Sequence, residues 1–150
     1  MRHLREELRQ SMLETKLRKG LSWEDVSKFL GKSPVYSAML VYGYGQCDDS
    51  ETKLLGDLFE LTAQQREILK SAPYREPVQP WPPTDPFVYR FYEIVLLYMP
   101  VIKDVAHEIF GDGIMSAIDM SIDLKKVVDE AGNDRMLISF NGKWLRYKKF

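Results

Sequence analysis

This 150-residue sequence is poor in several residue types that common functions need. Its one cysteine, Cys47, excludes a disulfide within the chain, and we interpret it as a buried or incidental thiol. Two histidines, His3 and His107, are too few for a histidine metal cluster and leave little material for a serine-type triad. The 21 Lys and Arg residues nearly balance the 22 Asp and Glu residues, so no general excess of charge exists for binding polyanions.

Long apolar runs are also missing. No run approaches the ~20 residues needed to cross a bilayer, and the first ten residues, MRHLREELRQ, are too charged for the apolar part of a secretory signal. His107-Glu108 begins like a zinc-protease helix, but Gly111 stands where the second histidine ligand would be. Neither a phosphate-binding Gly-rich loop nor a dinucleotide fingerprint occurs. We therefore expect a soluble cytoplasmic protein with no metal or cofactor.

What the chain does have is a strongly apolar stretch, Asp85–Ala117, that begins like a helix. Asp85 is a good N-cap, and Pro86 suits the first helical position, where its missing N–H costs nothing. Pro100 interrupts this stretch and is predicted to open a second helix over Val101–Phe110.

Two charges lie within the first of these helices. Arg90 and Glu93 are three residues apart, so they are neighbours on one helix face within an apolar surround. Burying such a pair costs several kcal/mol per ion, so stability alone does not readily explain it. The pair is either a structural bridge at a subunit interface or an arginine that binds an anionic ligand while the glutamate holds it in place.

Ser116 follows this helical stretch after a turn signal, Gly111-Asp112-Gly113. A glycine-flanked turn before a small hydroxyl residue can present backbone N–H groups and one O–H to an anion. Alone, the turn is a weak signal.

The first 72 residues predict a compact bundle of about five helices, similar to repressor-type helix-turn-helix domains. Apolar residues recur at helical spacing from Leu4 to Leu17, and Ser22 predicts the N-cap of a second helix that Gly31 closes. Three more helices are predicted over about 33–42, 49–61 and 62–71, with Asp49 or Ser50 capping the fourth and Thr62 the fifth.

This arrangement raises an alternative function, a DNA-binding regulator with a C-terminal oligomerisation domain. The predicted recognition helix, SPVYSAMLVYG, carries no cationic or amide side chain for base edges, and only Lys32 lies just before it. Residues 1–72 hold 11 basic and 11 acidic residues. We therefore favour a bundle that packs and helps to assemble subunits, and expect no nucleic acid as a partner.

Residues 73–86 contain six prolines in fourteen residues, which predicts an extended connector in which Trp81 docks against a neighbouring surface. Beyond Ser116, alternation over Ile118–Lys125 predicts a half-buried strand. Met136–Phe140 is predicted as a second strand, and Asn141-Gly142 as a hairpin turn into a third, Lys143–Tyr147.

The predicted fold class is therefore α+β, with a helical bundle at 1–72, a connector at 73–86, and a small helix-plus-sheet domain at 87–150. A core this small gains most when its sheet edges pair with another chain, so we expect an intertwined dimer.

Several motifs at consistent spacing resemble those of the cyanases, also called cyanate hydratases or cyanate lyases. They are YRFYE at 89–93, HEIFGDGIMSAI at 107–118, SIDLKKVVD at 121–129 and FNGKWLRYKKF at 140–150. The resemblance implies that Arg90, Glu93 and Ser116 are the catalytic residues. It also implies a homodecamer of five dimers with active sites shared between subunits.

The implied reaction is an attack of bicarbonate on cyanate through a dicarboxylate-like intermediate, which loses carbon dioxide and leaves carbamate to break down to ammonia and carbon dioxide. Bicarbonate is then a co-substrate and the nucleophile, and no cofactor is implied. Arg90 and Ser116 can stabilise anionic oxygens. The sequence leaves open whether Glu93 orients Arg90 or relays a proton. An inactive protein that kept the fold would be expected to lack one of the three residues, and all three are present.

Overall fold

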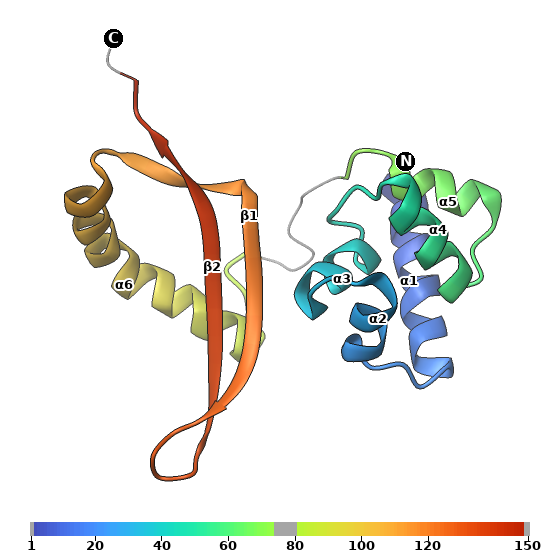
Figure 1. Cartoon of the computed structure of the whole chain (residues 1–150), viewed down its shortest axis with the longest axis horizontal. Coiled ribbons are helices and arrows are strands. Elements are labelled where there is room, and N and C mark those ends of the chain that lie inside the picture. Colours follow the sequence, from blue (N-terminus) through green and yellow to red (C-terminus); the bar gives the residue numbers. More distant parts are fainter. Residues whose placement is uncertain (1, 74–80, 149–150) are drawn as a thin grey trace. The chain divides into compact units, whose positions relative to one another are not determined.

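The computed structural model describes residues 2–73 and 81–148, which form six helices and one two-stranded sheet (Figure 1). This confirms the predicted α+β class and the helical N-terminal part. Most of the predicted connector, residues 74–80, lies outside the described residues, and so do the last two residues of the chain.

Five of the helices make up an N-terminal bundle. They are α1 (Arg2–Arg18), α2 (Trp23–Leu30), α3 (Pro34–Val41), α4 (Asp49–Leu58) and α5 (Ala63–Lys70). The helix starts follow from local hydrogen bonds. At α2 the Ser22 Oγ accepts from the Asp25 N–H at 3.0 Å, while an Asp25 oxygen accepts from the Ser22 N–H at 2.8 Å, a complete capping box.

One cap differs from the prediction. The N-cap of α4 is Asp48, not Asp49 or Ser50. An Asp48 oxygen accepts from the Glu51 N–H at 2.7 Å, and a Glu51 oxygen accepts from the Asp48 N–H at 3.0 Å. Glu51 supplies the reason, because an acidic residue three positions after Asp48 closes the capping box there.

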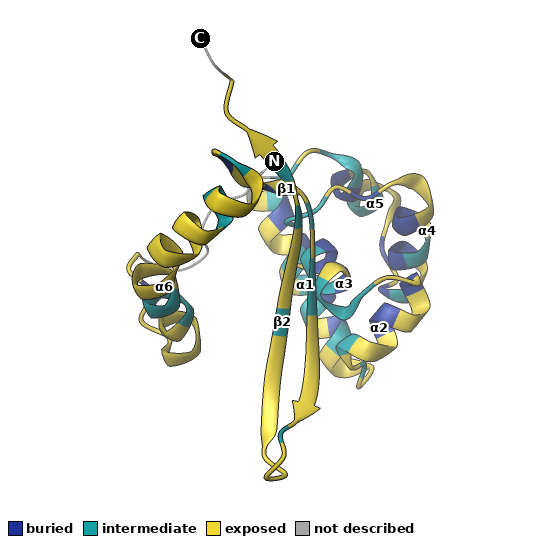
Figure 2. Cartoon of the chain, turned by 60° about the vertical axis from the view of Figure 1, so that its left-hand side comes forward, coloured by how far each residue is buried: buried dark blue, intermediate teal, exposed yellow. Residues whose placement is uncertain are grey.

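The hydrophobic core of the described chain lies entirely in this bundle, where most of the dark residues of Figure 2 are found. Its members are Leu8, Met12, Val26, Leu30, Leu40, Val41, Cys47, Leu55, Phe59, Leu61, Ile68 and Leu69. Cys47 is thus a buried thiol, as predicted, and burial raises its pKa to about 12. The thiol is therefore protonated at neutral pH and unsuited to act as a nucleophile.

The C-terminal part begins with one long helix, α6 (Pro86–Phe110). Asp85 and Pro86 start it as predicted, and the Asp85 carboxylate accepts from the Val88 N–H at 3.0 Å. The predicted break at Pro100 is wrong, because α6 continues through it. A proline removes one intrahelical hydrogen bond, and the helical hydrogen bonds on both sides can outweigh that loss.

Two long strands follow, β1 (Gly113–Val128) and β2 (Asp134–Arg146), instead of the three that were predicted. The turn of the hairpin is the loop around Asp129, whose Oδ1 accepts from the Ala131 and Asn133 N–H groups at 3.0 and 2.9 Å. Asn141-Gly142 lies inside β2, and Gly142 does not have the positive φ that a two-residue hairpin turn requires.

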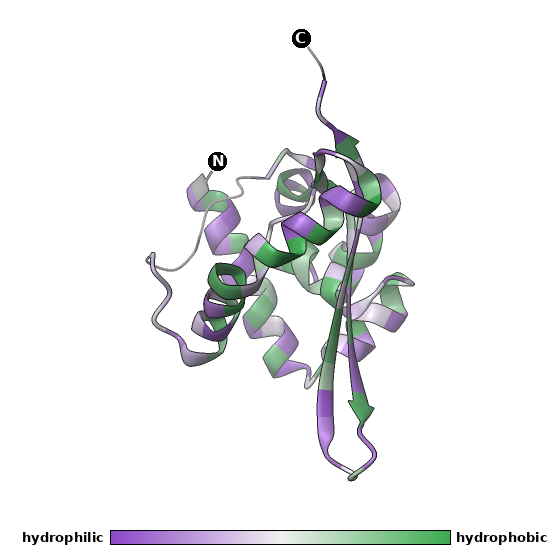
Figure 3. Ribbon diagram, turned by 90° about the vertical axis from the view of Figure 1, so that its left-hand side faces the viewer, coloured by the Kyte–Doolittle hydropathy of each residue, from purple (hydrophilic) through white to green (hydrophobic). Residues whose placement is uncertain are grey.

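The surfaces of α6 and the hairpin differ from those of the bundle. In one chain α6 has no buried residue, and the strand predicted as half-buried exposes Ile118 at 80% and Leu124 at 47% (Figure 2). Hydrophobic positions recur along the helix and both strands in Figure 3. Within residues 2–73 and 81–148, no helix combines the length and hydropathy of a membrane span.

Candidate active site

Arg90 and Glu93 lie in the first two turns of α6 and contact each other. Arg90 Nε is 3.1 Å from Glu93 Oε2, with the two side chains 75% and 43% exposed. The helix positions them, since residues three apart share a face. An exposed pair of this kind contributes only about 0–1 kcal/mol to stability.

The sequence pattern placed this pair in an apolar surround, and the surround consists of side chains that a single chain leaves exposed. Phe87, Tyr89 and Leu97 are 62%, 42% and 67% exposed. Trp81 contacts Tyr92 edge-on, with ring centroids 4.8 Å apart, but the residue is 72% exposed, so its docking on a neighbouring surface stays a prediction. The pair is therefore surrounded by apolar groups but is not buried within one chain.

Ser116 is the fourth residue of β1 and is buried, with 8% of its surface exposed. Its Oγ accepts from two backbone N–H groups, that of Ile118 at 3.2 Å and that of Asp119 at 2.9 Å. A serine hydroxyl has two acceptor lone pairs and one donor hydrogen. Because both acceptor positions are occupied, the capacity that remains is to donate, which is what an anionic oxygen requires.

The start of β1 is fixed against the end of α6. His107 Nε2 is 3.0 Å from the Gly113 carbonyl oxygen, and the Phe110 and Trp144 rings pack with centroids 5.1 Å apart. The Tyr147 N–H donates to the Asp112 carbonyl at 3.1 Å. His107 is thus a packed, hydrogen-bonded histidine, as predicted, and it helps to hold the segment that leads to Ser116.

The structure brings together only two of the three predicted site residues within one chain. Arg90 and Glu93 form a pair near the N-terminal end of α6, whereas β1 begins beside its C-terminal end (Figure 1). Arg90 is 20 residues before Phe110, about 30 Å along a helix. In the described chain, Ser116 makes no hydrogen bond to either residue.

Sequence reasoning missed the two amides that orient the Ser116 hydroxyl. They belong to Ile118 and Asp119, whose side chains suggested only an alternating strand. A small hydroxyl residue that bonds to N–H groups two and three positions later is a known local pattern. No residue type at those positions signals it, because the donors are backbone groups.

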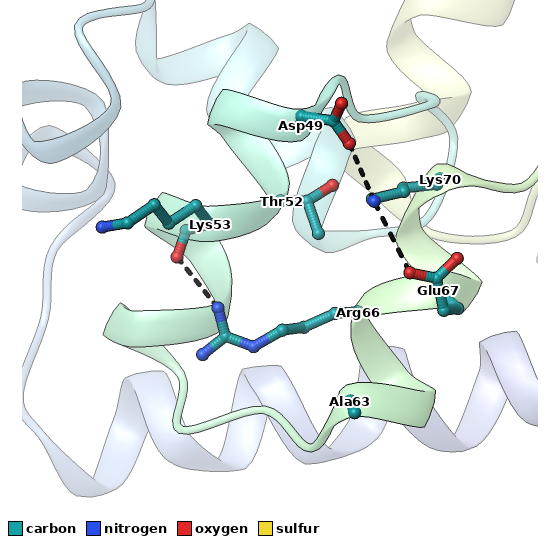
Figure 4. A pocket seen from close by; sticks show the side chains of 7 residues that line it. All are labelled: Asp49, Thr52, Lys53, Ala63, Arg66, Glu67 and Lys70. Carbon is teal, nitrogen blue, oxygen red and sulfur yellow. Dashed lines mark hydrogen bonds and ion pairs between the residues drawn. The ribbon is translucent and has the colours of Figure 1, made fainter.

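The bundle contains a pocket between α4 and α5, drawn in Figure 4, whose charged side chains pair with one another. Lys70 Nζ lies 2.7 Å from Asp49 and 3.5 Å from Glu67. Arg66 donates to the Lys53 and Leu61 carbonyls at 3.3 and 3.1 Å and to the Asp57 carboxylate at 3.0 Å. The Arg66 bond holds the pKa of the Asp57 carboxyl below its ordinary value. The cationic side chains of Lys70 and Arg66 are therefore already paired with acidic side chains of the bundle.

The helix that DNA recognition would use is α3, and its neighbouring cation is already paired. Lys32 Nζ lies 3.7 Å from the buried Glu51 and 5.7 Å from the Tyr36 ring centroid. Tyr36 itself donates to Glu51 at 3.0 Å. These contacts do not favour the DNA-binding alternative.

The fold and the site together define an α+β protein whose C-terminal part carries an arginine–glutamate pair and an oriented serine hydroxyl. Two family models match the chain, "Cyanate hydratase, N-terminal" over residues 5–73 and "Cyanate lyase C-terminal domain" over residues 80–149. The chain therefore belongs to the cyanate hydratase (cyanate lyase) family, a family of lyase enzymes.

Individual relatives agree with this assignment. The cyanate hydratase of Aquifex aeolicus is 63% identical over 139 residues, which is 93% of each chain. That of Sulfurisphaera tokodaii is 53% identical over 146 residues, 97% of this chain and 98% of the relative. A crystal structure of cyanase from T. urticae matches with a TM-score of 0.80 and 31% identity over 93% of this chain and 96% of that one.

Proposed function

We propose that this enzyme decomposes cyanate in a bicarbonate-dependent reaction, with Arg90, Glu93 and Ser116 as its catalytic residues and no cofactor. The observation that carries the proposal is the 63% identity to a protein named cyanate hydratase over nearly the whole chain. The geometry of Ser116 adds support, because a hydroxyl with both lone pairs occupied is a donor for a small anion.

The proposed reaction begins when a bicarbonate oxygen attacks the cyanate carbon, which gives a dicarboxylate-like intermediate with two negative charges. The bond between that oxygen and the bicarbonate carbon then breaks and releases carbon dioxide. The bicarbonate hydrogen and one more proton reach the nitrogen, so that carbamate remains. Carbamate takes up a further proton and breaks down to ammonia and a second carbon dioxide.

Both substrates are anions, so the protein's main task is to hold two like charges together. Fixed donors in a site without water are commonly the largest catalytic contribution. In this proposal Ser116 donates its hydroxyl hydrogen to one oxygen of the intermediate. Arg90 gives a two-pronged interaction to a carboxylate through its terminal Nη groups, because Nε faces Glu93 at 3.1 Å.

We assign to Glu93 the orientation of Arg90. The 3.1 Å ion pair supports this role, since it places the Glu93 carboxylate where it can orient the guanidinium. Proton relay was the other interpretation of Glu93, and a glutamine at position 93 separates the two. Glutamine can still accept from Arg90 Nε but cannot carry a proton, so we expect Glu93→Gln to retain far more activity than Glu93→Ala.

We also propose that the site is completed by a second copy of the chain, in an intertwined dimer and a decamer of five dimers. Two observations support sharing. The apolar surround of the Arg90–Glu93 pair is exposed in one chain, and Ser116 follows the opposite end of α6. A second chain could cover the exposed apolar side chains around the pair and supply its own Ser116 to the site.

The test is ammonia release from cyanate by the purified protein, with and without added bicarbonate. We expect bicarbonate-dependent release, reduced at least about a hundredfold in Ser116→Ala and Arg90→Ala, because loss of one fixed donor commonly costs that much. The matched controls are Ser121→Ala on the same strand and Arg135→Ala in β2, both exposed. We expect them to keep parental activity.

Light scattering must show the same assembly for every variant. Absence of ammonia release from a folded, assembled parent would contradict the proposed reaction. Equal losses in Ser116→Ala and Ser121→Ala would contradict the assignment of Ser116.

A further inference from the structure

The register of the hairpin changes between its loop and Ser116. At the loop, the Asp129 N–H donates to the Asn133 carbonyl at 3.0 Å, and towards the base Gly142 approaches Ser116. Between these points β1 advances by 13 positions (129 to 116) while β2 advances by nine (133 to 142). The extra residues of β1 cannot pair one-to-one with β2, so β1 bulges in this interval.

The hydrogen bonds of Ser116 fall inside this interval. Its Oγ accepts from the N–H groups of Ile118 and Asp119, which follow it within this interval. The direction of the hydroxyl hydrogen therefore depends on the path of the backbone from Ser116 to Asp119. A displacement of that path would turn the donor away from its proposed ligand.

Gly142 of β2 lies against the start of this path, beside the Ser116 carbonyl. A Cβ placed on it would sit 2.7 Å from the Ser116 carbonyl oxygen and 2.5 Å from Met115 Cγ, closer than real Cβ atoms approach such neighbours. By contrast, Gly132 in the hairpin loop has open space around it and a φ of 82°. Glycine at 132 allows the positive φ of the loop, whereas glycine at 142 allows the close approach of two strands.

We infer that Gly142 is a positioning residue, which keeps β2 close enough to hold the Ser116 peptide and the two amides behind its hydroxyl in place. The inference rests on the proposed role of Ser116 for its effect on activity. Its structural part, the link between Gly142 and the Ser116 hydrogen bonds, does not depend on which reaction the protein catalyses.

The experiment measures hydrogen exchange of the Ile118 and Asp119 amides by NMR, together with ammonia release, in Gly142→Ala and Ser116→Ala. We expect both substitutions to speed exchange at these two amides, by roughly two- to tenfold for a lost hydrogen bond. Gly142→Ala should also lower kcat about tenfold or more, because small misplacements of catalytic groups are costly. Asn141→Ala, the exposed neighbour on the other face of β2, is the matched control and should change neither quantity.

The double variant Met115→Ala/Gly142→Ala separates the contact of the added Cβ with Met115 from its contact with the Ser116 carbonyl. The same variant replaces Gly142→Ala in the experiment if the single variant does not fold. It removes the methionine atoms near the added Cβ and keeps the approach to the Ser116 carbonyl. We expect it to remain impaired. Restored exchange protection and activity in this variant, or parental exchange in Gly142→Ala, would overturn the inference. A parent without cyanate activity would contradict only the proposed function, since the exchange measurement needs no substrate.

Discussion

Gly56 occupies a helical position for which its intrinsic helix propensity is unfavourable. It lies in α4, where alanine is normally favoured over glycine by about 1 kcal/mol. The Arg66 guanidinium covers it so closely that an added Cβ would collide with the Arg66 Cζ and Nη1 atoms. In that position the guanidinium also makes hydrogen bonds from α5 to the Lys53 carbonyl and the Asp57 carboxylate of α4.

We therefore expect Gly56→Ala to destabilise the protein by about 1 kcal/mol, since displacing Arg66 loses more than alanine gains. In an Arg66→Ala background the same change should stabilise by up to about 1 kcal/mol. Urea unfolding of the four proteins of this cycle measures both effects. A stabilising Gly56→Ala in the parent would show that the Arg66 contacts contribute little.

At the scale of one element, the N-terminus of α4 distinguishes two adjacent aspartates. Asp48 caps the helix in a reciprocal pair with Glu51, whereas Asp49 forms an exposed ion pair with Lys70. Removal of a cap typically costs about 1 kcal/mol, and an exposed pair contributes less. Aspartate and serine both fit an N-cap, and Asp48, Asp49 and Ser50 follow one another. The sequence pattern alone therefore placed the cap one or two positions too late.

We expect Asp48→Ala to lower the free energy of unfolding by about 1 kcal/mol, and Asp49→Ala by less than half of that. Urea denaturation at neutral pH measures both. Equal losses would show that the reciprocal bonds with Glu51 do not decide where the helix begins.

Two other elements differ from their local patterns for related reasons. Pro100 and Asn141-Gly142 are strong local signals for a break and a turn, yet α6 and β2 run through them. A local sequence signal shows which backbone conformation is possible at that position. Hydrogen bonding along the whole element decides whether that conformation forms. In β2 the glycine serves instead where two strands approach closely.

At the scale of the whole molecule, the exposed apolar residues of α6 and the hairpin require a partner. Ile109 of α6 is 69% exposed, and no hydrophobic residue of α6 or of the described hairpin belongs to the core. Contiguous apolar surface of this kind marks interfaces. The proposed partner is a second copy of the chain.

We expect the parent to be a dimer or larger by light scattering at micromolar concentration. Ile109→Glu should reduce the molar mass and abolish ammonia release, because it places a charge in the proposed interface. Leu17→Glu on α1, where leucine is 83% exposed, is the matched control and should keep the parental mass. A parent that stays monomeric would contradict the shared site.

Much of this protein follows from local chemistry that its sequence already displays. The five N-terminal helices, the capping box at Ser22, the start of α6 at Asp85 and the α+β class all follow from residue types at fixed spacing. Such features depend on neighbours a few positions apart, and the sequence specifies those neighbours directly. The resemblance to the family motifs implies Arg90, Glu93 and Ser116 as the catalytic residues, and that assignment stays a proposal.

Only the tertiary structure decided what depends on residues far apart in the chain. It joined the predicted helices into one α6, replaced three strands by two, and set Gly142 against Ser116. It also left the Arg90–Glu93 pair exposed in a single chain. Strand register and burial result from which surfaces meet, and the linear order of residues does not specify those meetings.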